Sequence, residues 1–127
     1  LAGLRHAEVA ELMAEASFLV SLNSHEAFNS TVPEAMAAGC IPVCYDAFGG
    51  RDYLIDGENA FVFPNHHVFP LVEKLLELTR GAAERTGELA RMRTRGRETA
   101  GRFTREATRA ALDGAFARLA QAVARSA

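Results

Sequence analysis

Apolar residues along this chain recur at two spacings, one typical of helices and the other of strands. Positions three and four residues apart predict an amphipathic helix over residues 6–16, with an apolar face made of Val9, Leu12, Met13 and Ala16. Short apolar runs at 18–20, 41–45 and 60–63 are bounded by polar residues, Gly or Pro. These runs predict three buried strands.

Four further helices follow from the same reasoning. Residues 33–38 are rich in helix formers and end at Gly39, where a helix C-terminal glycine belongs. A second amphipathic helix ends near Gly81, and its apolar face consists of Val68, Leu71, Val72 and Leu75. Residues 82–101 are Arg-rich and permit a helix with a weak apolar face. A last helix begins at Thr104 and carries the stripe Leu112, Phe116, Leu119 and Val123.

This order of elements predicts an α/β fold with a mainly parallel sheet flanked by helices. At 127 residues the chain forms one domain at most. We divide it into a core over 1–79 and an Arg-rich helical segment over 80–127 that packs on the core. Three strands make a thin sheet, and a doubly wound unit normally begins with a strand. We therefore expect a further strand upstream, in a longer protein of which this chain is a piece.

Charge is distributed unevenly, although the formal net charge is only −2. Residues 1–79 carry three basic and eleven acidic side chains, net −8, and residues 80–127 carry eleven arginines and five acids, net +6. The basic segment fits a solvated helical face, or a surface for a membrane, nucleic acid or the acidic body of its own protein. No aromatic residue lies among the arginines of 91–97, which argues against a nucleic-acid partner.

The composition, 49% apolar and 24% charged, is that of an ordinary globular domain. No apolar run approaches the roughly 20 residues of a membrane span. We therefore expect a cytoplasmic protein, with peripheral membrane contact through the basic segment as one open role.

The cysteines and histidines give no sign of a disulfide or a metal site. Cys40 and Cys44, the only cysteines, are four positions apart on a strand, too far for a disulfide, and we expect both to be buried and reduced. His66 and His67 are the only hint of metal ligands, and a structural zinc site needs four partners. We expect no metal site.

The stretch from Ser21 to Tyr45 carries the candidate chemistry. It is predicted to form a strand end, a loop, a helix and the next strand, with Glu26 and Glu34 eight positions apart. A loop leading from a buried strand into a helix N-terminus is suited to hold an anion such as phosphate. Thr31 and Glu34 also fit a capping box, in which Glu34 would accept the Thr31 N–H and need no ligand.

Several motifs follow one another in this region. Glu26-x7-Glu34 continues as Ala35-Met36-Ala37-Ala38-Gly39-Cys40-Ile41-Pro42-Val43, and later come Gly49-Gly50, Asp56-Gly57-Glu58-Asn59 and Phe61-Val62-Phe63-Pro64. The series resembles the C-terminal, nucleotide-sugar half of retaining glycosyltransferases with the GT-B fold, of the glycosyl transferases group 1 type. Their pattern is E-G-F-G-x-x-x-x-E-A-M-A-x-G-x-P-V-V, followed by a Gly-Gly segment, a D-G-x-N-G turn and a V-x-P strand end. The match covers about residues 12–78.

The resemblance implies a partial Rossmann-like domain that holds half of a sugar-nucleotide site. Glu34 would bind the nucleotide ribose, and Glu26, the catalytic candidate, would face the donor sugar. The backbone of Ala27, Phe28, Asn29, Ser30 and Thr31 would approach the diphosphate. Carboxylates accept hydrogen bonds from vicinal hydroxyls, and N–H groups at a helix start meet phosphate oxygens.

The implied reaction is transfer of a sugar from a UDP- or GDP-linked donor to an acceptor hydroxyl, with retention at the anomeric carbon. The acceptor would be a glycan or a lipid-linked molecule. No cofactor or metal is implied, since basic residues neutralise the leaving diphosphate in this class. An N-terminal acceptor-binding domain of the same protein would complete the active site, so residues 1–127 alone should not transfer sugar.

The chain departs from the family pattern in three places. Ala27 and Asn29 replace two glycines, although Asn tolerates the positive φ that a left-handed turn requires. Arg51 follows Gly49-Gly50 where Pro-Glu is common, and it could contact phosphate or acceptor, or pair with Asp46 or Asp52. The basic pair that the family carries near the start of this half is absent before Glu26.

Two other functions remain open from the sequence. A nucleotide-sugar epimerase of the same architecture would use similar donor contacts with different acids and bases. A non-catalytic interaction domain would keep the scaffold and explain the altered glycines.

Overall fold

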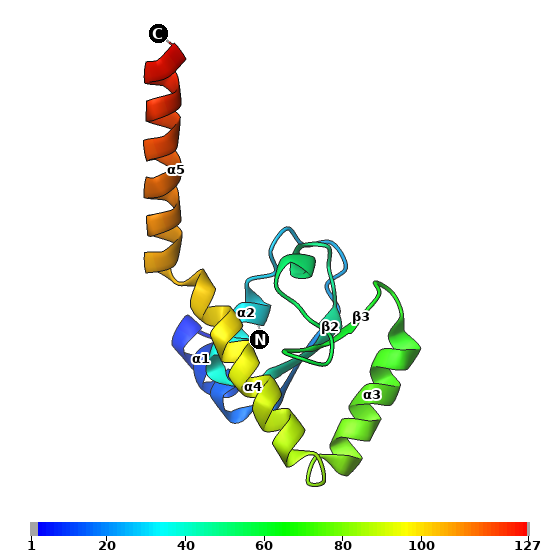
Figure 1. Ribbon diagram of the computed structural model, residues 1–127. Coiled ribbons are helices and arrows are strands. Elements are labelled where there is room, and N and C mark those ends of the chain that lie inside the picture. Colours follow the sequence, from blue (N-terminus) through cyan, green and yellow to red (C-terminus); the bar gives the residue numbers. More distant parts are fainter. Residues whose placement is uncertain (1–2, 127) are drawn as a thin grey trace.

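The computed structural model describes residues 3–126, so the expectations that involve Leu1, Ala2 and Ala127 lie outside the described residues. Figure 1 shows a small α/β body with one long helix standing away from it. The α-helices are α1 (His6–Glu15), α2 (Thr31–Ala38), α3 (Val68–Gly81), α4 (Thr86–Ala100) and α5 (Arg105–Ser126). The strands are β1 (Phe18–Ser21), β2 (Ile41–Tyr45) and β3 (Phe61–Phe63), and two short 3-10 helices are η1 (Gly49–Asp52) and η2 (Gly101–Phe103).

The three strands form one parallel sheet in the order β1-β2-β3. Val20 pairs with Val43, and Val43 in turn pairs with Phe61, so the register brings the strand ends together. The predicted α/β fold with a parallel sheet is confirmed. Because all strands run the same way, the loops after β1, β2 and β3 meet at one edge of the sheet, where ligands bind in open α/β sheets.

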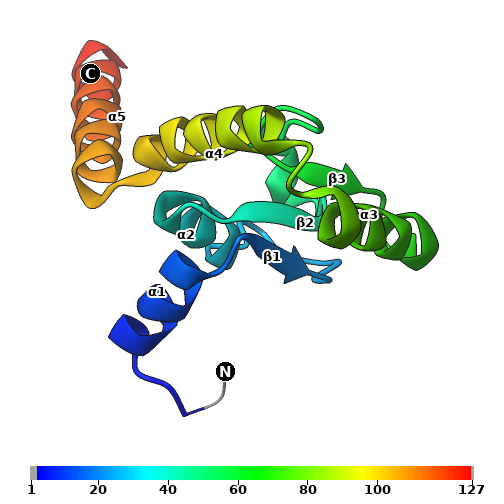
Figure 2. The same ribbon diagram turned by 90° about the horizontal axis from the view of Figure 1, so that it is seen from below.

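Helices cover both faces of the sheet. Alternate residues of β2, among them Ile41 and Val43, are fully buried against Leu71 and Leu78 of α3. Figure 2 shows α2 and α3 near opposite ends of the sheet, with α4 passing along it. On the other face α2 contributes the core residues Val32 and Met36, which cluster with Tyr53, Ala60 and Ala100. Strand β2 is buried along its whole length and therefore reads as a continuous apolar run. The edge strands β1 and β3 are only partly buried, and Val20 is exposed, so the prediction of three buried strands holds fully for β2 alone.

The Arg-rich helix α4 packs through Leu89 and Met92, which join the core, and through the small residues Gly96, Thr99 and Ala100. Gly96 faces Met36 of α2, where an added Cβ would lie 3.5 Å from the Met36 side chain. Asn59 joins the helix to the turn before β3: its amide donates to the Thr99 hydroxyl at 3.0 Å and to the Tyr53 carbonyl at 2.8 Å. Only a close approach of backbones allows such contacts, so tertiary packing fixes the position of this helix.

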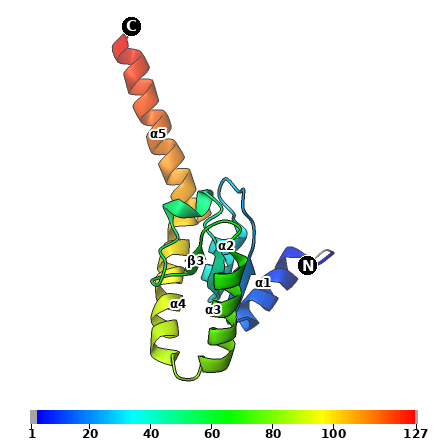
Figure 3. The same ribbon diagram turned by 90° about the vertical axis from the view of Figure 1, so that its right-hand side faces the viewer.

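The last helix does not pack on the core. We expected residues 80–127 to do so, and α4 does, whereas α5 projects away from the body in Figures 1 and 3. None of the residues 105–126 is buried, and the stripe Leu112, Phe116, Leu119 and Val123 is more than half exposed. Within residues 3–126, no helix combines the length and apolarity needed to cross a bilayer.

We predict that replacing Asn59 by Leu destabilises the domain by about 2–4 kcal/mol. Asn59 is 2% exposed, and its loss would leave the Ile55 N–H and the Tyr53 carbonyl without their present partner. Urea denaturation of Asn59→Leu beside the control Glu58→Gln, an exposed neighbour, measures the difference. Equal midpoints for the two variants would contradict the prediction.

We also predict that neither cysteine reacts with a thiol reagent in the folded protein. Both are free and buried, as expected, and burial raises the pKa of Cys44 to about 12. An unfolded cysteine has a pKa near ~8.5, so the unfolded chain loses protons first and stability falls as the pH rises above that value. Thiol titration with and without urea, together with denaturation at several alkaline pH values, checks both statements. Rapid labelling without urea would refute them.

Candidate functional site

The loops at the carboxyl edge of the sheet adopt an unusual backbone conformation. Among residues 3–126, four non-glycine residues have positive φ: Asn29 (54°) after β1, Ala47 (49°) and Phe48 (62°) after β2, and His66 (68°) after β3. Residues held in such conformations cost free energy and often mark functional sites. All four lie in the loops that follow the strands, so the strain concentrates at one edge of the domain.

Both candidate carboxylates are exposed at this edge. Glu26 lies in the β1–α2 loop, and its N–H donates to the Ala47 carbonyl at 3.1 Å, which joins it to the loop after β2. Glu34 lies in the first turn of α2. The loop between the two glutamates is therefore open to solvent at both ends.

The capping box considered for Thr31 and Glu34 does not form. The N-cap of α2 is Ser30, and it makes no side-chain capping hydrogen bond. The Glu34 N–H donates to the Ser30 carbonyl at 3.1 Å, while the Glu34 side chain stays exposed. Helix α2 begins one residue earlier than a cap at Thr31 requires. The Glu34 carboxylate is therefore not positioned to accept the Thr31 N–H. Its carboxylate stays available to a ligand.

The β1–α2 loop is held by buried polar groups and not by glycines. Asn29 is 7% exposed, adopts the positive φ anticipated from the sequence, and donates from its amide to the Ser21 hydroxyl at 3.3 Å. The Tyr53 hydroxyl donates to the Phe28 carbonyl at 2.9 Å. Burial raises the pKa of Tyr53 to about 12, so this hydroxyl remains a donor at neutral pH. Ala27, Phe28, Ser30 and Thr31 are exposed.

The backbone N–H groups of residues 27–31 make no hydrogen bond within the described part of the chain. The first bonds after this segment are those of Val32 to the Asn29 carbonyl and of Glu34 to the Ser30 carbonyl. Two of these N–H groups, those of the N-cap Ser30 and of Thr31, belong to the start of α2, where unpaired donors and the helix dipole create a positive electrostatic potential. The segment can therefore bind an anion through its backbone alone.

The loop after β2 lies against this segment, backbone to backbone. Gly49 donates from its N–H to the Glu26 carbonyl at 3.1 Å. A Cβ at Gly49 would collide with the Ala27 carbonyl oxygen and lie 2.7 Å from the Glu26 carbonyl oxygen. The close approach of the two loop backbones therefore requires glycine at position 49, in the Gly-Gly segment noted in the sequence.

An aromatic group that the sequence did not reveal borders Glu34. The rings of Phe28, Tyr53 and Phe103 lie 5.0–5.5 Å apart, and Phe103 comes from η2, far along the chain. A groove of about 260 Å³ beside them is lined by Phe28, Ser30, Pro33, Glu34, Ala37, Ala100, Phe103 and Thr104. Phe103 follows a polar helix without any periodic pattern, so no local signal could have placed it here.

The charged and imidazole groups near Glu26 come mainly from the other two loops. Arg51 pairs with Asp46 at 2.7 Å, which decides between the two partners suggested by the sequence. Partial burial acts to raise the pKa of Asp46, but hydrogen bonds from Arg51 and the Phe48 N–H outweigh it and hold the pKa below its usual value. His25 lies against the Phe48 ring. Residues 3–126 hold no group of three side chains that could bind a metal ion.

In a comparison with known protein families, residues 1–99 match the family described as glycosyl transferases group 1. No curated protein matches the chain significantly.

We predict that Gly49→Ala separates the two loops and destabilises the domain by about 1–3 kcal/mol. The new methyl group would collide with the backbone oxygens of the β1–α2 loop. Gly87→Ala in α4 is the matched control, because no atom lies within 4 Å of a Cβ there, and it should leave stability unchanged or raise it by up to about 1 kcal/mol. Thermal unfolding measures both variants, and equal stability would show that the loops do not need this contact.

Proposed function

The chain belongs to the glycosyl transferases group 1 family, and we propose that it binds a nucleotide-sugar donor at the carboxyl edge of its sheet. A glycosyltransferase of this kind, in its full-length form, would transfer the sugar to an acceptor hydroxyl with retention at the anomeric carbon. The observation that carries the proposal is the row of unpaired N–H groups at residues 27–31, between two exposed glutamates.

The diphosphate of the donor is assigned to the segment 27–31. Unpaired N–H groups at a helix start stabilise anions by direct hydrogen bonds and through the helix dipole. Anion binding here does not require positive side chains, which suits a chain that carries no Lys or Arg between Arg5 and Arg51. Ala27 adds only a methyl group to this exposed surface, so the replaced glycine leaves the donors accessible.

The two glutamates are assigned to the two ends of the donor. Glu34 would accept hydrogen bonds from the ribose hydroxyls, since its carboxylate is exposed and does not cap the helix. The groove beside it, bordered by Phe28 and Phe103, offers apolar surface to the nucleoside. Glu26 would face the donor sugar from the other end of the loop.

In the proposed transfer the acceptor oxygen bonds to the anomeric carbon as the diphosphate departs with the bonding electron pair. The departing diphosphate oxygen takes the acceptor proton. The role of residues 27–31 is to stabilise the negative charge that grows on the leaving group. Glu26 would orient the sugar hydroxyls. Further cations would come from outside residues 1–127, so the isolated chain should bind donor without turnover.

We predict that UDP- or GDP-sugars bind the protein and that Glu34→Gln weakens this binding by about tenfold, because a neutral amide replaces a charged acceptor. Glu73→Gln, an exposed position on α3, is the control and should bind as the unchanged protein does. Isothermal calorimetry with both nucleotide classes measures the affinities.

Two observations would oppose the proposal, one from calorimetry and one from an assay of the sugar product. Failure of every nucleotide sugar to bind would favour a non-catalytic interaction domain. Epimerisation of a bound nucleotide sugar without acceptor would favour an epimerase of the same architecture. Robust sugar transfer by residues 1–127 alone would refute the need for further cations.

A further inference from the structure

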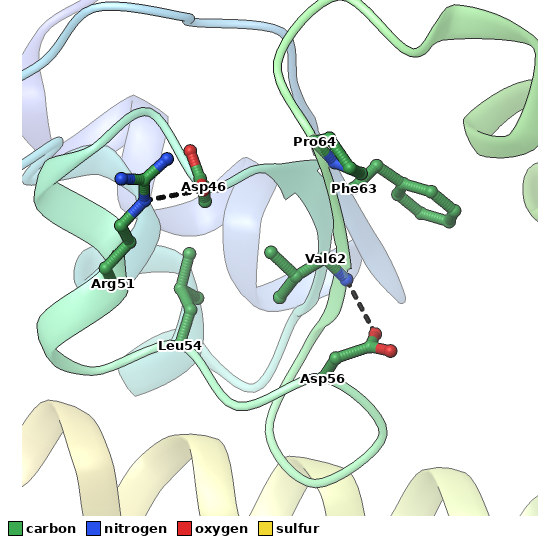
Figure 4. Close-up of a pocket in the computed structure, with 7 residues that line it drawn as sticks. All are labelled: Asp46, Arg51, Leu54, Asp56, Val62, Phe63 and Pro64. Atoms are coloured by element: carbon green, nitrogen blue, oxygen red, sulfur yellow. Dashed lines mark hydrogen bonds and ion pairs between the residues drawn. The ribbon is translucent and has the colours of Figure 1, made fainter.

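A second hollow lies at the carboxyl edge, beside the loop after β2. Its volume is about 540 Å³, more than twice that of the groove beside Glu34. Figure 4 shows it between the segment that carries Arg51 and strand β3. It is lined by Asp46, Arg51, Leu54, Asp56, Val62, Phe63 and Pro64. None of these residues belongs to the segment 27–31 or to the two glutamates.

The polar groups of this hollow each keep part of their hydrogen-bonding capacity. Arg51 donates from Nε to Asp46 Oδ2 at 2.7 Å, which leaves its two terminal amino groups. Asp56 accepts the Val62 N–H on Oδ1 at 2.8 Å, which leaves Oδ2. Figure 4 shows the guanidinium beside Asp46 and the Asp56 carboxylate beside the backbone of Val62, well apart from each other. The site therefore offers donors on one side and acceptors on the other.

Apolar side chains lie between these polar groups. Leu54, Val62 and Pro64 contribute aliphatic surface, and Leu54 and Val62 are only partly exposed. A sugar ring presents hydroxyls around its rim and C–H groups on its faces, so it matches charged groups at the edge and aliphatic carbons at the floor. An inorganic anion would face two carboxylates, and a bare cation would face Arg51, so neither suits this lining.

The hollow continues the row of proposed donor contacts. In the proposed donor site, Glu34 binds the nucleoside end, residues 27–31 bind the diphosphate, and Glu26 faces the sugar. The Glu26 N–H donates to the Ala47 carbonyl, which lies in the loop after β2. In the same loop the Phe48 N–H donates to Asp46 Oδ1 at 3.2 Å. Asp46 and Arg51 therefore belong to the loop that is hydrogen-bonded to Glu26, the sugar end of the proposed donor site.

We propose that this hollow binds a sugar ring of the acceptor, with Arg51 and Asp56 as the residues that recognise its hydroxyls. The acceptor assignment rests on the proposed donor orientation, whereas binding of a sugar ring rests on the lining alone. The acceptor of the reaction would then be a glycan or glycoside, and this chain would contribute to its selection.

The test is NMR of the protein with labelled methyl groups, titrated with methyl glycosides of glucose, mannose and galactose while UDP or GDP saturates the donor site. At least one glycoside should shift the Leu54 and Val62 methyl signals in a saturable manner. Asp56→Asn should lower the affinity for that glycoside by about tenfold, because the amide oxygen still accepts the Val62 N–H but the charge is lost. Glu58→Gln, an exposed acid two positions away, is the control and should leave the affinity unchanged.

The outcomes separate this inference from the proposed function. No shift of Leu54 and Val62 with any glycoside at its solubility limit overturns the sugar subsite. Shifts of these methyls by the nucleotide sugar itself, with displacement of the glycoside, overturn the acceptor assignment. Asp56→Asn should leave the UDP or GDP affinity unchanged, and Glu34→Gln should leave glycoside binding unchanged. Loss of nucleotide binding therefore counts against the donor site and the acceptor assignment that rests on it, but not against the sugar subsite.

Discussion

The candidate site depends on the contact between two loop backbones at the carboxyl edge of the sheet. Gly49 lies so close to the carbonyls of Glu26 and Ala27 that no side chain fits between them. The Tyr53 hydroxyl donates to the Phe28 carbonyl. These contacts engage carbonyl groups of the β1–α2 loop, whereas the N–H groups of residues 27–31 make no hydrogen bond within the described part of the chain. The packing of the two loops therefore uses the carbonyls of this segment and not its N–H groups.

Strained backbone conformations and buried polar contacts both maintain the arrangement of these two loops. Asn29 holds a positive φ that its side-chain bond to Ser21 helps to maintain, and Ala47 and Phe48 in the opposing loop also have positive φ. Each such residue costs of order 1–3 kcal/mol, which the core of the domain must offset. A flexible glycine loop would lose entropy on binding its ligand, whereas a loop already ordered by Asn29 and Tyr53 loses less. The replaced glycines therefore do not by themselves argue against ligand binding.

The sequence predicted those parts of the fold whose causes are local. Strands β1 and β2 are bounded by turn residues and deeply apolar, and α2 ends at Gly39 with φ of 100°, so pattern and propensity sufficed. The position of α4 was not predictable, because it depends on Gly96 and on the Asn59–Thr99 bond across 40 residues. For the site, the two glutamates came from a motif. Phe103 came only from the fold, since it has no periodic signal, and the fold also chose Asp46 over Asp52 as the partner of Arg51.

Electrostatics limits what this domain can do by itself. The diphosphate of a donor would bind to a core of net charge −8, so repulsion acts against it at long range. Backbone dipoles act only within about one turn of the helix start and are little affected by distant charge. Such a site can hold the diphosphate in place, but it stabilises the full charge of a departing diphosphate less than cations would. The arginines of α4 and α5 lie on other elements, and Arg51, at this edge, already pairs with Asp46. In the proposed reaction, further positive charge would therefore come from outside the core.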